Sequence, residues 1–206
     1  MYACPDLDAI CRWVGEQTGA PPAPGGQHPS FGTRNALLSL GARTYLELIG
    51  PDAEQPAPEQ PRPFGTDWLR SPSLRGWAAA SDDIARAIQV AQRYGHQLGP
   101  LGEGRRRTPE GTELSWRMAR AQPAGAGGPD VFPFLIDWGE SPHPATTSPG
   151  GLALERFVLL TPAPGVAKEL LAALGLEGPW EVVPSPGPAL RAEMVGRGGE
   201  RVVLAS

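Results

Sequence analysis

The 206-residue chain has few cysteines and no excess of positive charge, and each shortage excludes a class of protein. Its two cysteines, Cys4 and Cys11, are too few for a disulfide framework or a zinc knuckle. Eighteen basic against twenty-two acidic residues give a formal net charge of −4. Because no positive field would attract nucleic acid or an anionic membrane, we expect neither as a partner.

Long apolar runs are also missing from the chain. No stretch approaches the ~20 apolar residues of a membrane-spanning helix, and residues 1–6 do not resemble a basic and then apolar leader. We therefore expect a cytoplasmic protein, in a reducing compartment where thiols stay unpaired. Since Cys11 falls on a predicted helical face, both cysteines are interpreted as small buried apolar residues.

Glycine and proline are abundant, with 27 and 25 residues respectively. A hydrophobic content of 40% with six tryptophans nevertheless predicts a packed core, because a disordered chain is poorer in such residues. The length suits one compact domain or two small ones. Stretches rich in Pro and Gly are predicted to be loops within the fold, at residues 21–26, 52–63, 123–129 and 141–151.

One order of elements occurs three times along the chain: a short apolar strand, a capped amphipathic helix, a glycine stop and then two or three strands. Apolar residues spaced three and four apart predict helices near residues 7–14, 84–91 and 166–174. Alternating segments such as 35–40, 44–49 and 113–118 predict strands. One helix per several strands indicates an α+β protein, with helices on one face of each sheet and the other face free to line a site.

Several short strings occur in the order and spacing found in one protein family. They are Pro5-Asp6-Leu7-Asp8, His28-Pro29 with Gly32-Thr33-Arg34-Asn35, Tyr45-Leu46-Glu47-Leu48-Ile49, and Pro133-Phe134-Leu135-Ile136-Asp137-Trp138 with His143-Pro144. Together with the repeated βαβββ order, these strings resemble the glyoxalase-like branch of the vicinal oxygen chelate superfamily. The resemblance spans roughly residues 2–151.

This resemblance implies tandem βαβββ units that pair, each rolling its sheet into half of an open barrel. We expect residues 1–151 to form the paired units and residues 152–206 to add a partial third unit packed on them. The cavity shared by the pair would bind a small-molecule ligand. The activity that the resemblance implies is metal-assisted proton transfer next to a carbonyl group.

The resemblance further implies a divalent metal held by His, Glu or Gln from the first and last strands of each unit. Glu47 occupies such a position, whereas residues 1–4 and the opening of the second unit at 74–77 contain no His or carboxylate. Asp137 lies one residue away from the position that aligns with Glu47, and such an offset turns a side chain to the opposite face of a strand. We therefore assign no metal ligand and no certain cofactor, and leave a divalent metal open.

Two residues are candidates for catalysis. Glu47 shares a predicted strand face with Tyr45 and Ile49, an apolar setting that suits a general acid or base. His28 lies in a polar stretch close to glycines and could carry a proton. The competing interpretations are the outward face of a half-buried sheet for Glu47 and a surface loop for His28.

Four more residues are candidates for substrate binding: Asn35 through its amide, Trp116 and Trp138 as walls of an apolar cavity, and His143 in a loop between prolines. Capping and core packing are the ordinary alternatives for these residue types. The basic run Arg105-Arg106-Arg107 is interpreted as a solvated turn and not as an anion clamp.

Three functions are compatible with these residues. The first is a lyase- or isomerase-type enzyme that acts on a carbonyl-containing metabolite through Glu47 and His28. The second is a non-catalytic protein that binds or sequesters a hydrophobic small molecule, for which Trp116 and Trp138 matter more. The third is a pseudoenzyme whose third unit serves dimerisation, and a homodimer is compatible with the other two as well.

Overall fold

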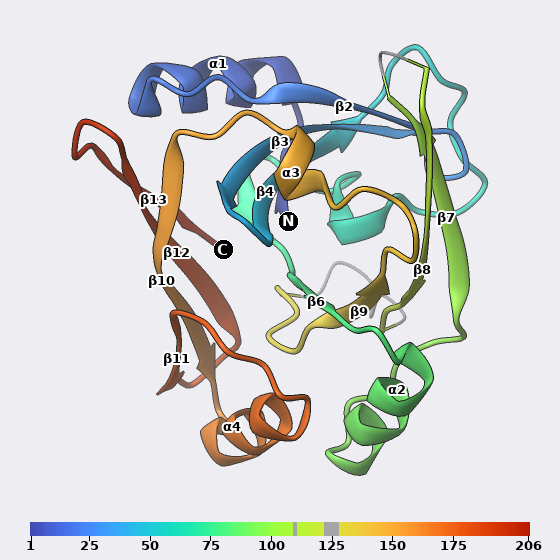
Figure 1. Ribbon diagram of the computed structural model, residues 1–206, viewed down its shortest axis with the longest axis vertical. Helices are drawn as coiled ribbons and strands as arrows, with labels where there is room; N and C mark the ends of the chain where they lie inside the picture. Colours follow the sequence, from blue (N-terminus) through green and yellow to red (C-terminus); the bar gives the residue numbers. More distant parts are fainter. Residues whose placement is uncertain (109–110, 122–127) are drawn as a thin grey trace.

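A computed structural model describes residues 1–108, 111–121 and 128–206 (Figure 1). The first segment contains β1 (Tyr2–Ala3), α1 (Leu7–Thr18), β2 (Ala23–His28), β3 (Thr33–Gly41), β4 (Thr44–Pro51), a 3-10 helix (Pro63–Gly65) and β5 (Ser73–Leu74). The second contains β6 (Ala78–Ala80), α2 (Ile84–Arg93), β7 (Gly102–Arg107), β8 (Glu113–Ala119), β9 (Phe134–Asp137) and the short α3 (Pro144–Thr147). The third contains β10 (Leu152–Thr161), α4 (Pro164–Ala173), β11 (Trp180–Pro184), β12 (Ala189–Gly196) and β13 (Arg201–Ala205).

The first two segments share one sheet topology. The first sheet has the order β2-β3-β4-β1-β5 and the second the order β6-β9-β8-β7. In both, the strand before the helix runs parallel to the last strand of its unit, β1 beside β4 and β6 beside β9. The α+β class and the tandem βαβββ units predicted from the sequence are thus confirmed, and the sheets of the described residues do not close into a barrel.

The predicted helices are present, and their ends follow from the residues that cap them. Asp6 and Asp83 each accept a hydrogen bond from the backbone N–H three residues further on, at 2.9 and 3.0 Å, which satisfies an amide at the start of α1 and α2. Gly19 follows α1 with a φ of 63°, the left-handed conformation that favours glycine. No helix in the described part of the chain is long and apolar enough to cross a membrane.

One strand occupies part of a stretch predicted to be a loop. Residues 23–28 form β2, although Pro24, Gly25 and Gly26 are poor strand formers. As the edge strand of its sheet, β2 has one side on which Pro24 needs no partner, and its register with β3 shifts between Pro24 and Gly26, leaving a bulge at Gly25. The predicted loop at 141–151 contains α3, and most of the one at 123–129 lies outside the described residues.

The third segment consists of one strand, one helix and three further strands, and its sheet is ordered differently. Its order is β11-β10-β12-β13, so the strand before the helix, β10, runs parallel to the next strand, β11, and not to the last strand of its unit. Leu159 and Met194 of this sheet share one buried cluster with Leu38 and Leu48 of the first sheet. Figure 1 shows the third sheet, orange to red, on the side of β3 and β4 away from β7 and β8.

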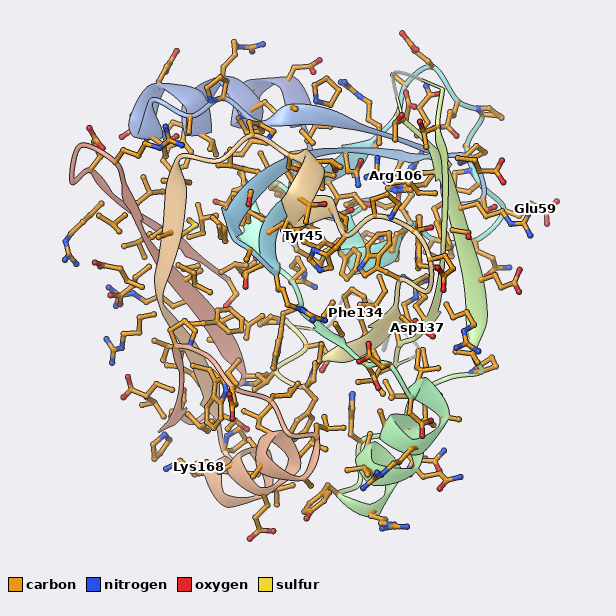
Figure 2. All side chains as sticks on the ribbon, in the orientation of Figure 1. Tyr45, Glu59, Arg106, Phe134, Asp137 and Lys168 are labelled. Atoms are coloured by element: carbon orange, nitrogen blue, oxygen red, sulfur yellow. The ribbon has the colours of Figure 1, made fainter. Side chains whose placement is uncertain are left out.

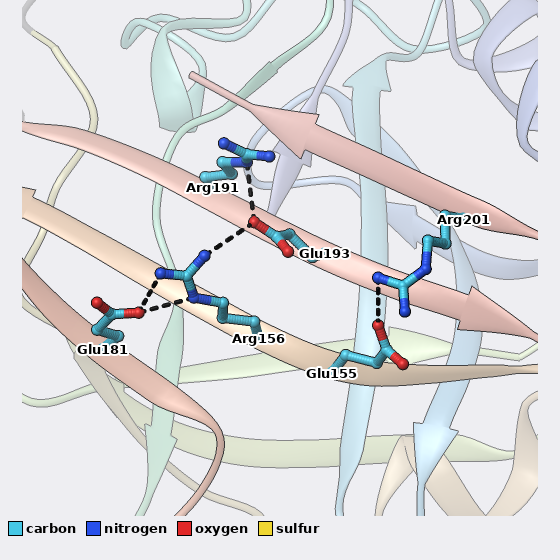
Figure 3. Close-up of polar contacts among 6 residues, drawn as sticks. All are labelled: Glu155, Arg156, Glu181, Arg191, Glu193 and Arg201. Carbon is cyan, nitrogen blue, oxygen red and sulfur yellow. Dashed lines mark hydrogen bonds and ion pairs between the residues drawn. The ribbon is translucent and has the colours of Figure 1, made fainter.

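The other face of the third sheet carries a row of ion pairs (Figure 3). They join Arg156 to Glu181 and Glu193, Arg191 to Glu193, and Arg201 to Glu155. Most of these side chains are well exposed, so water screens each pair and limits its contribution to stability. These charged side chains keep this face of the third sheet in contact with water. The opposite face packs on the first unit.

Candidate functional site

A cavity lies between the inner faces of the first and second sheets. Alternate residues of β3, β4, β8 and β9 line it, and Glu47 shares its face with Tyr45 and Ile49, as the sequence alternation predicts. Its volume of about 70 Å³ suits a small ligand. Figure 2 shows Tyr45, Arg106 and Phe134 toward the interior of the molecule, in contrast to Lys168 at its edge. The lining residues are Met1, His28, Phe31, Thr33, Asn35, Leu37, Tyr45, Glu47, Ile49, Pro63, Phe64, Arg106, Trp116, Met118, Arg120, Phe134, Ile136, Trp138 and Pro144.

The carboxylate of Glu47 is held by a neighbouring amide. Asn35 on β3 is buried, and its Nδ2 donates a hydrogen bond of 2.8 Å to Oε1 of Glu47 on β4. The amide oxygen of Asn35 lies against Gly25, where an added Cβ would come within 2.3 Å of it. The bulge at Gly25 therefore gives the amide the room that it needs to face Glu47, and Oε2 of the carboxylate has no hydrogen bond with the described residues.

His28 lies at the end of β2, buried beside the same group of residues. Its Nδ1 lies 3.1 Å from Oγ1 of Thr33, and its ring meets the ring of Trp116 edge to face. Burial lowers the pKa of His28, the charge of Glu47 raises it and that of Arg106 lowers it further, so the ring is neutral near pH 7. A neutral imidazole beside a carboxylate can exchange a proton with a bound molecule.

Tyr45, Trp138 and His143 form a wall between this cavity and a second one. The ring centroid of Tyr45 lies 6.5 Å from that of Trp138 and 5.5 Å from that of His143. Tyr45 and Trp138 line both cavities, whereas His143 lines only the second, of about 280 Å³, next to the third sheet. Burial raises the pKa of Tyr45, with a further rise from Glu47, so its hydroxyl stays protonated.

His143 is held by its own helix and not by the group around Glu47. Its Nδ1 accepts a hydrogen bond from the backbone N–H of Ala145 at 3.2 Å, which caps α3. Burial lowers its pKa, and Arg43 lowers it further. Of the six residues predicted as site residues, the structure brings five around one cavity and places His143 behind its aromatic wall.

Trp116 of β8 crosses the second sheet and rests on a glycine of β7. A Cβ added to Gly104 would come within 2.2 Å of the indole of Trp116, so that indole lies directly over the glycine. The centroids of Trp116 and Trp138 are 5.1 Å apart, and the two indoles form a continuous apolar wall. Nε1 of Trp138 is buried without a hydrogen-bond partner in the described part of the chain.

Arg106 corrects an interpretation of the sequence. The run Arg105-Arg106-Arg107, expected as a solvated turn, belongs to β7, and strand alternation turns Arg106 into the protein while Arg105 stays exposed. Arg106 is buried, lines the cavity and donates a hydrogen bond to the carbonyl of Gly25 at the bulge of β2. The prediction of a solvated turn is wrong for Arg106. Its partner carbonyl, that of Gly25, belongs to the other sheet, so no pattern in the sequence near Arg106 indicates the contact.

A second arginine at the cavity was also not predicted. Arg120 directly follows β8 and lines the cavity, with its guanidinium carbon 5.4 Å from the ring centroid of Phe31. It continues the alternation of Trp116 and Met118 on the same strand, and this spacing of two is the signal that could have identified it.

The described residues do not fit a divalent metal. Among the side chains that bind such ions, His28 and Glu47 line the cavity, and the described residues contain no group of three or more His, Cys, Asp or Glu that could hold a metal. The guanidinium groups of Arg106 and Arg120 line the same space, and their positive charges would repel a metal cation there.

Asp137 lies on the other face of β9, as its one-residue offset predicts. It pairs with Arg117 of β8 and accepts a hydrogen bond of 2.8 Å from the N–H of Gly139. The hydrogen bond from Arg117 holds the pKa of this carboxyl below its usual range. Asp137 is therefore covered by Arg117 on the other face of the second sheet and is not part of the cavity lining.

The two thiols are not nucleophiles in this fold. Cys4 is fully buried and Cys11 is half-buried, and neither forms a disulfide. Burial raises the pKa of Cys4 to about 12 and that of Cys11 to about 11, so both remain protonated at neutral pH. The interpretation of both as small packing residues agrees with this burial.

Comparison with known proteins adds the following findings. The family model for the glyoxalase-like domain matches residues 1–175. A search of curated proteins found no significant match. Among solved structures, a hypothetical protein from Staphylococcus aureus is 13% identical, with a TM-score of 0.55 over 99% of this chain and 82% of the other.

Two enzymes are also similar in structure. The Mn(II)-bound glyoxalase from Novosphingobium aromaticivorans is 12% identical, with a TM-score of 0.50 over 100% of this chain and 79% of the other. A variant of methylmalonyl-CoA epimerase from Streptomyces coelicolor, in complex with 2-nitronate-propionyl-CoA, is 20% identical, with a TM-score of 0.45 over 68% and 92%. The glyoxalase and the S. aureus protein share the fold of this chain.

Proposed function

The chain belongs to the family of glyoxalase-like domains in the vicinal oxygen chelate superfamily, and on that premise we propose that it is an enzyme that moves a proton next to the carbonyl group of a small metabolite. One observation carries this proposal. Glu47 is the single carboxylate among the described residues that line the cavity, and Asn35 orients it in apolar surroundings. A positioned carboxylate of this kind is suited to act as a general base.

The chain's own residues account for both halves of a proton transfer. Glu47 takes a proton from the carbon next to the carbonyl, and the electron pair of the broken C–H bond moves onto the carbonyl oxygen as an enolate. His28, Tyr45, Glu47 and Arg106 all line the one cavity, which supports their acting on one bound molecule. Arg106 stabilises the negative oxygen, and the proton returns from Glu47 or by way of His28 to complete an isomerisation.

The test is the incorporation of deuterium from D2O into small carbonyl compounds, followed by NMR. We expect wild-type protein to exchange the protons next to the carbonyl and Glu47→Gln to lose about 100-fold or more of that rate, with ligand affinity within a few fold of wild type. Glu103→Gln is the matched control, because Glu103 is an exposed carboxylate of β7. Equal rates for wild type and Glu47→Gln would overturn the proposal.

A second candidate function rests on the paired indoles. Trp116 and Trp138 make one wall of the cavity, and the lining is mostly apolar, which also suits a protein that binds or sequesters a small molecule without changing it. This function predicts that Trp116→Ala removes binding while no compound is turned over by the wild-type protein. Deuterium incorporation that depends on Glu47 would decide against it.

Two further expectations from the sequence stay predictions. The two unpaired cysteines suit a reducing cytoplasm, and a homodimer stays an expectation from the sequence; the proton-transfer proposal depends on neither. A division of the chain at residue 151 likewise stays a prediction. The buried cluster shared by the first and third sheets indicates that the two parts fold together.

A further inference from the structure

Arg120 is a cation at the cavity that pairs with no carboxylate among the described residues. Its backbone is fixed, since its carbonyl accepts a hydrogen bond of 2.8 Å from the N–H of Gly99. Its side chain is half-buried, lies over the ring of Phe31 and has no hydrogen bond or ion pair with any described residue. Burial alone lowers its pKa, which agrees with the lack of a nearby carboxylate.

Another arginine, near the end of β8, shows the ordinary alternative. Arg117 of β8 faces the other way, where it pairs with Asp137 and is about half exposed. A guanidinium at the cavity face has less water around it and no such pair, and an unpaired, partly desolvated charge costs stability. A ligand anion that pairs with this guanidinium would offset that cost.

The charge of the cavity lining points in the same direction. Its one described carboxylate, Glu47, is bound by the amide of Asn35, and the rest of the lining is mainly apolar. No described carboxylate of the lining therefore pairs with Arg120. Because Phe31 lies against the guanidinium of Arg120, the N–H edge of that group remains the part that can meet an anion in the bidentate geometry typical of arginine and carboxylate.

We propose that Arg120 and Phe31 form a subsite for the carboxylate of the substrate, so that the substrates of this protein are small oxo acids. That the bound molecule is a substrate rests on the proposed proton transfer. That it carries a carboxylate rests only on the residues of the cavity. Arg120 thus determines specificity, and Glu47 performs the chemistry.

The test is a binding titration of the wild-type protein with 2-oxobutyrate and with butanone, its counterpart without the carboxylate. Trp116 and Trp138 line the cavity, so their fluorescence reports occupancy. We expect 2-oxobutyrate to bind at least tenfold more tightly than butanone. Arg120→Gln removes a charged hydrogen bond and is expected to weaken 2-oxobutyrate by about 10- to 100-fold while leaving butanone unchanged.

Two controls keep the result interpretable. Arg117→Gln removes an arginine from the same strand on the opposite face and is expected to bind both compounds like wild type. Arg120→Lys keeps the charge without the bidentate edge and is expected to fall between Arg120→Gln and wild type. Thermal melting of each variant shows that it is folded, and we expect Arg120→Gln without ligand to melt no lower than wild type, because it loses an unpaired charge.

The outcomes are separable from those of the proposed function. Equal affinity for the two compounds, no binding of 2-oxobutyrate, or binding that Arg120→Gln leaves unchanged would each overturn the carboxylate subsite. Tighter binding of inorganic phosphate than of 2-oxobutyrate would also contradict it and would assign the anion to a phosphate group. Binding that depends on Arg120 without deuterium exchange would retain the subsite and refute only the proton transfer.

Discussion

At the scale of single residues, the site depends on one carboxylate and the amide that orients it. Asn35 donates to Glu47 at 2.8 Å, and its own oxygen is buried without a hydrogen-bond partner among the described atoms. Leaving a buried acceptor unsatisfied costs about 1–3 kcal/mol. The arrangement that positions Glu47 therefore lowers the stability of the fold, and such a loss of stability is typical of functional residues.

His28 makes the stability of the protein depend on pH. Burial lowers its pKa in the folded state relative to the ordinary value of 6.5, so the unfolded chain binds the proton more readily. The stability that neutral His28 contributes is present above pH 6.5 and is lost as the pH falls through the lower, folded pKa.

We therefore expect the free energy of unfolding of wild type, minus that of His28→Gln, to fall between about pH 7.5 and pH 5, by roughly 1.4 kcal/mol for each unit of pKa shift. Urea unfolding at the two pH values measures this difference, and the other titratable groups cancel because both proteins contain them. A difference that stays constant with pH would contradict a lowered pKa at His28.

At the scale of elements, β7 shapes the cavity mainly through residues without side chains. Gly104 provides the surface on which Trp116 lies, and Gly102 leaves open space beside β8. The same alternation places Arg106 on the cavity side of the strand. Substitution of Gly104 should therefore displace the indole of Trp116, whereas substitution of Gly102 should not.

Gly104→Ala is predicted to push Trp116 into the cavity, because the new Cβ would lie 2.2 Å from the indole. We expect at least a tenfold loss of affinity for cavity ligands, an altered Trp fluorescence spectrum, and a destabilisation of about 1–3 kcal/mol. Gly102→Ala is the control, since its Cβ would have its nearest neighbour at 4.0 Å. Unchanged binding by Gly104→Ala would show that this contact does not shape the site.

The same elements show what the sequence could and could not predict. Alternation along one strand was sufficient to place Glu47 with Tyr45 and Ile49, and caps and glycine stops were sufficient to locate the helices. The bond from Arg106 to the carbonyl of Gly25 crosses between residues 81 positions apart, and no local pattern encodes it. β2 was missed for a related reason, because its Pro and Gly residues form a strand only at a sheet edge with a bulge.

At the scale of the whole molecule, the third sheet packs against the first sheet. Its buried face packs on the side of β3 and β4 opposite to the cavity, and its charged face remains in water. This arrangement holds the strands that carry Asn35 and Glu47 between two packed layers. Its strand order differs from that of the paired units, which explains why the repeat seen in the sequence predicted its elements but not its topology.

The central claim is that the side chains around this cavity transfer a proton by themselves, with Glu47 as the base. The most direct measurement is the rate of deuterium incorporation into 2-oxobutyrate by protein dialysed against a chelator, with and without added Mn(II). We predict that exchange persists after chelation, gains little from Mn(II) and disappears in Glu47→Gln. Exchange that vanishes on chelation and returns with Mn(II) would contradict this account.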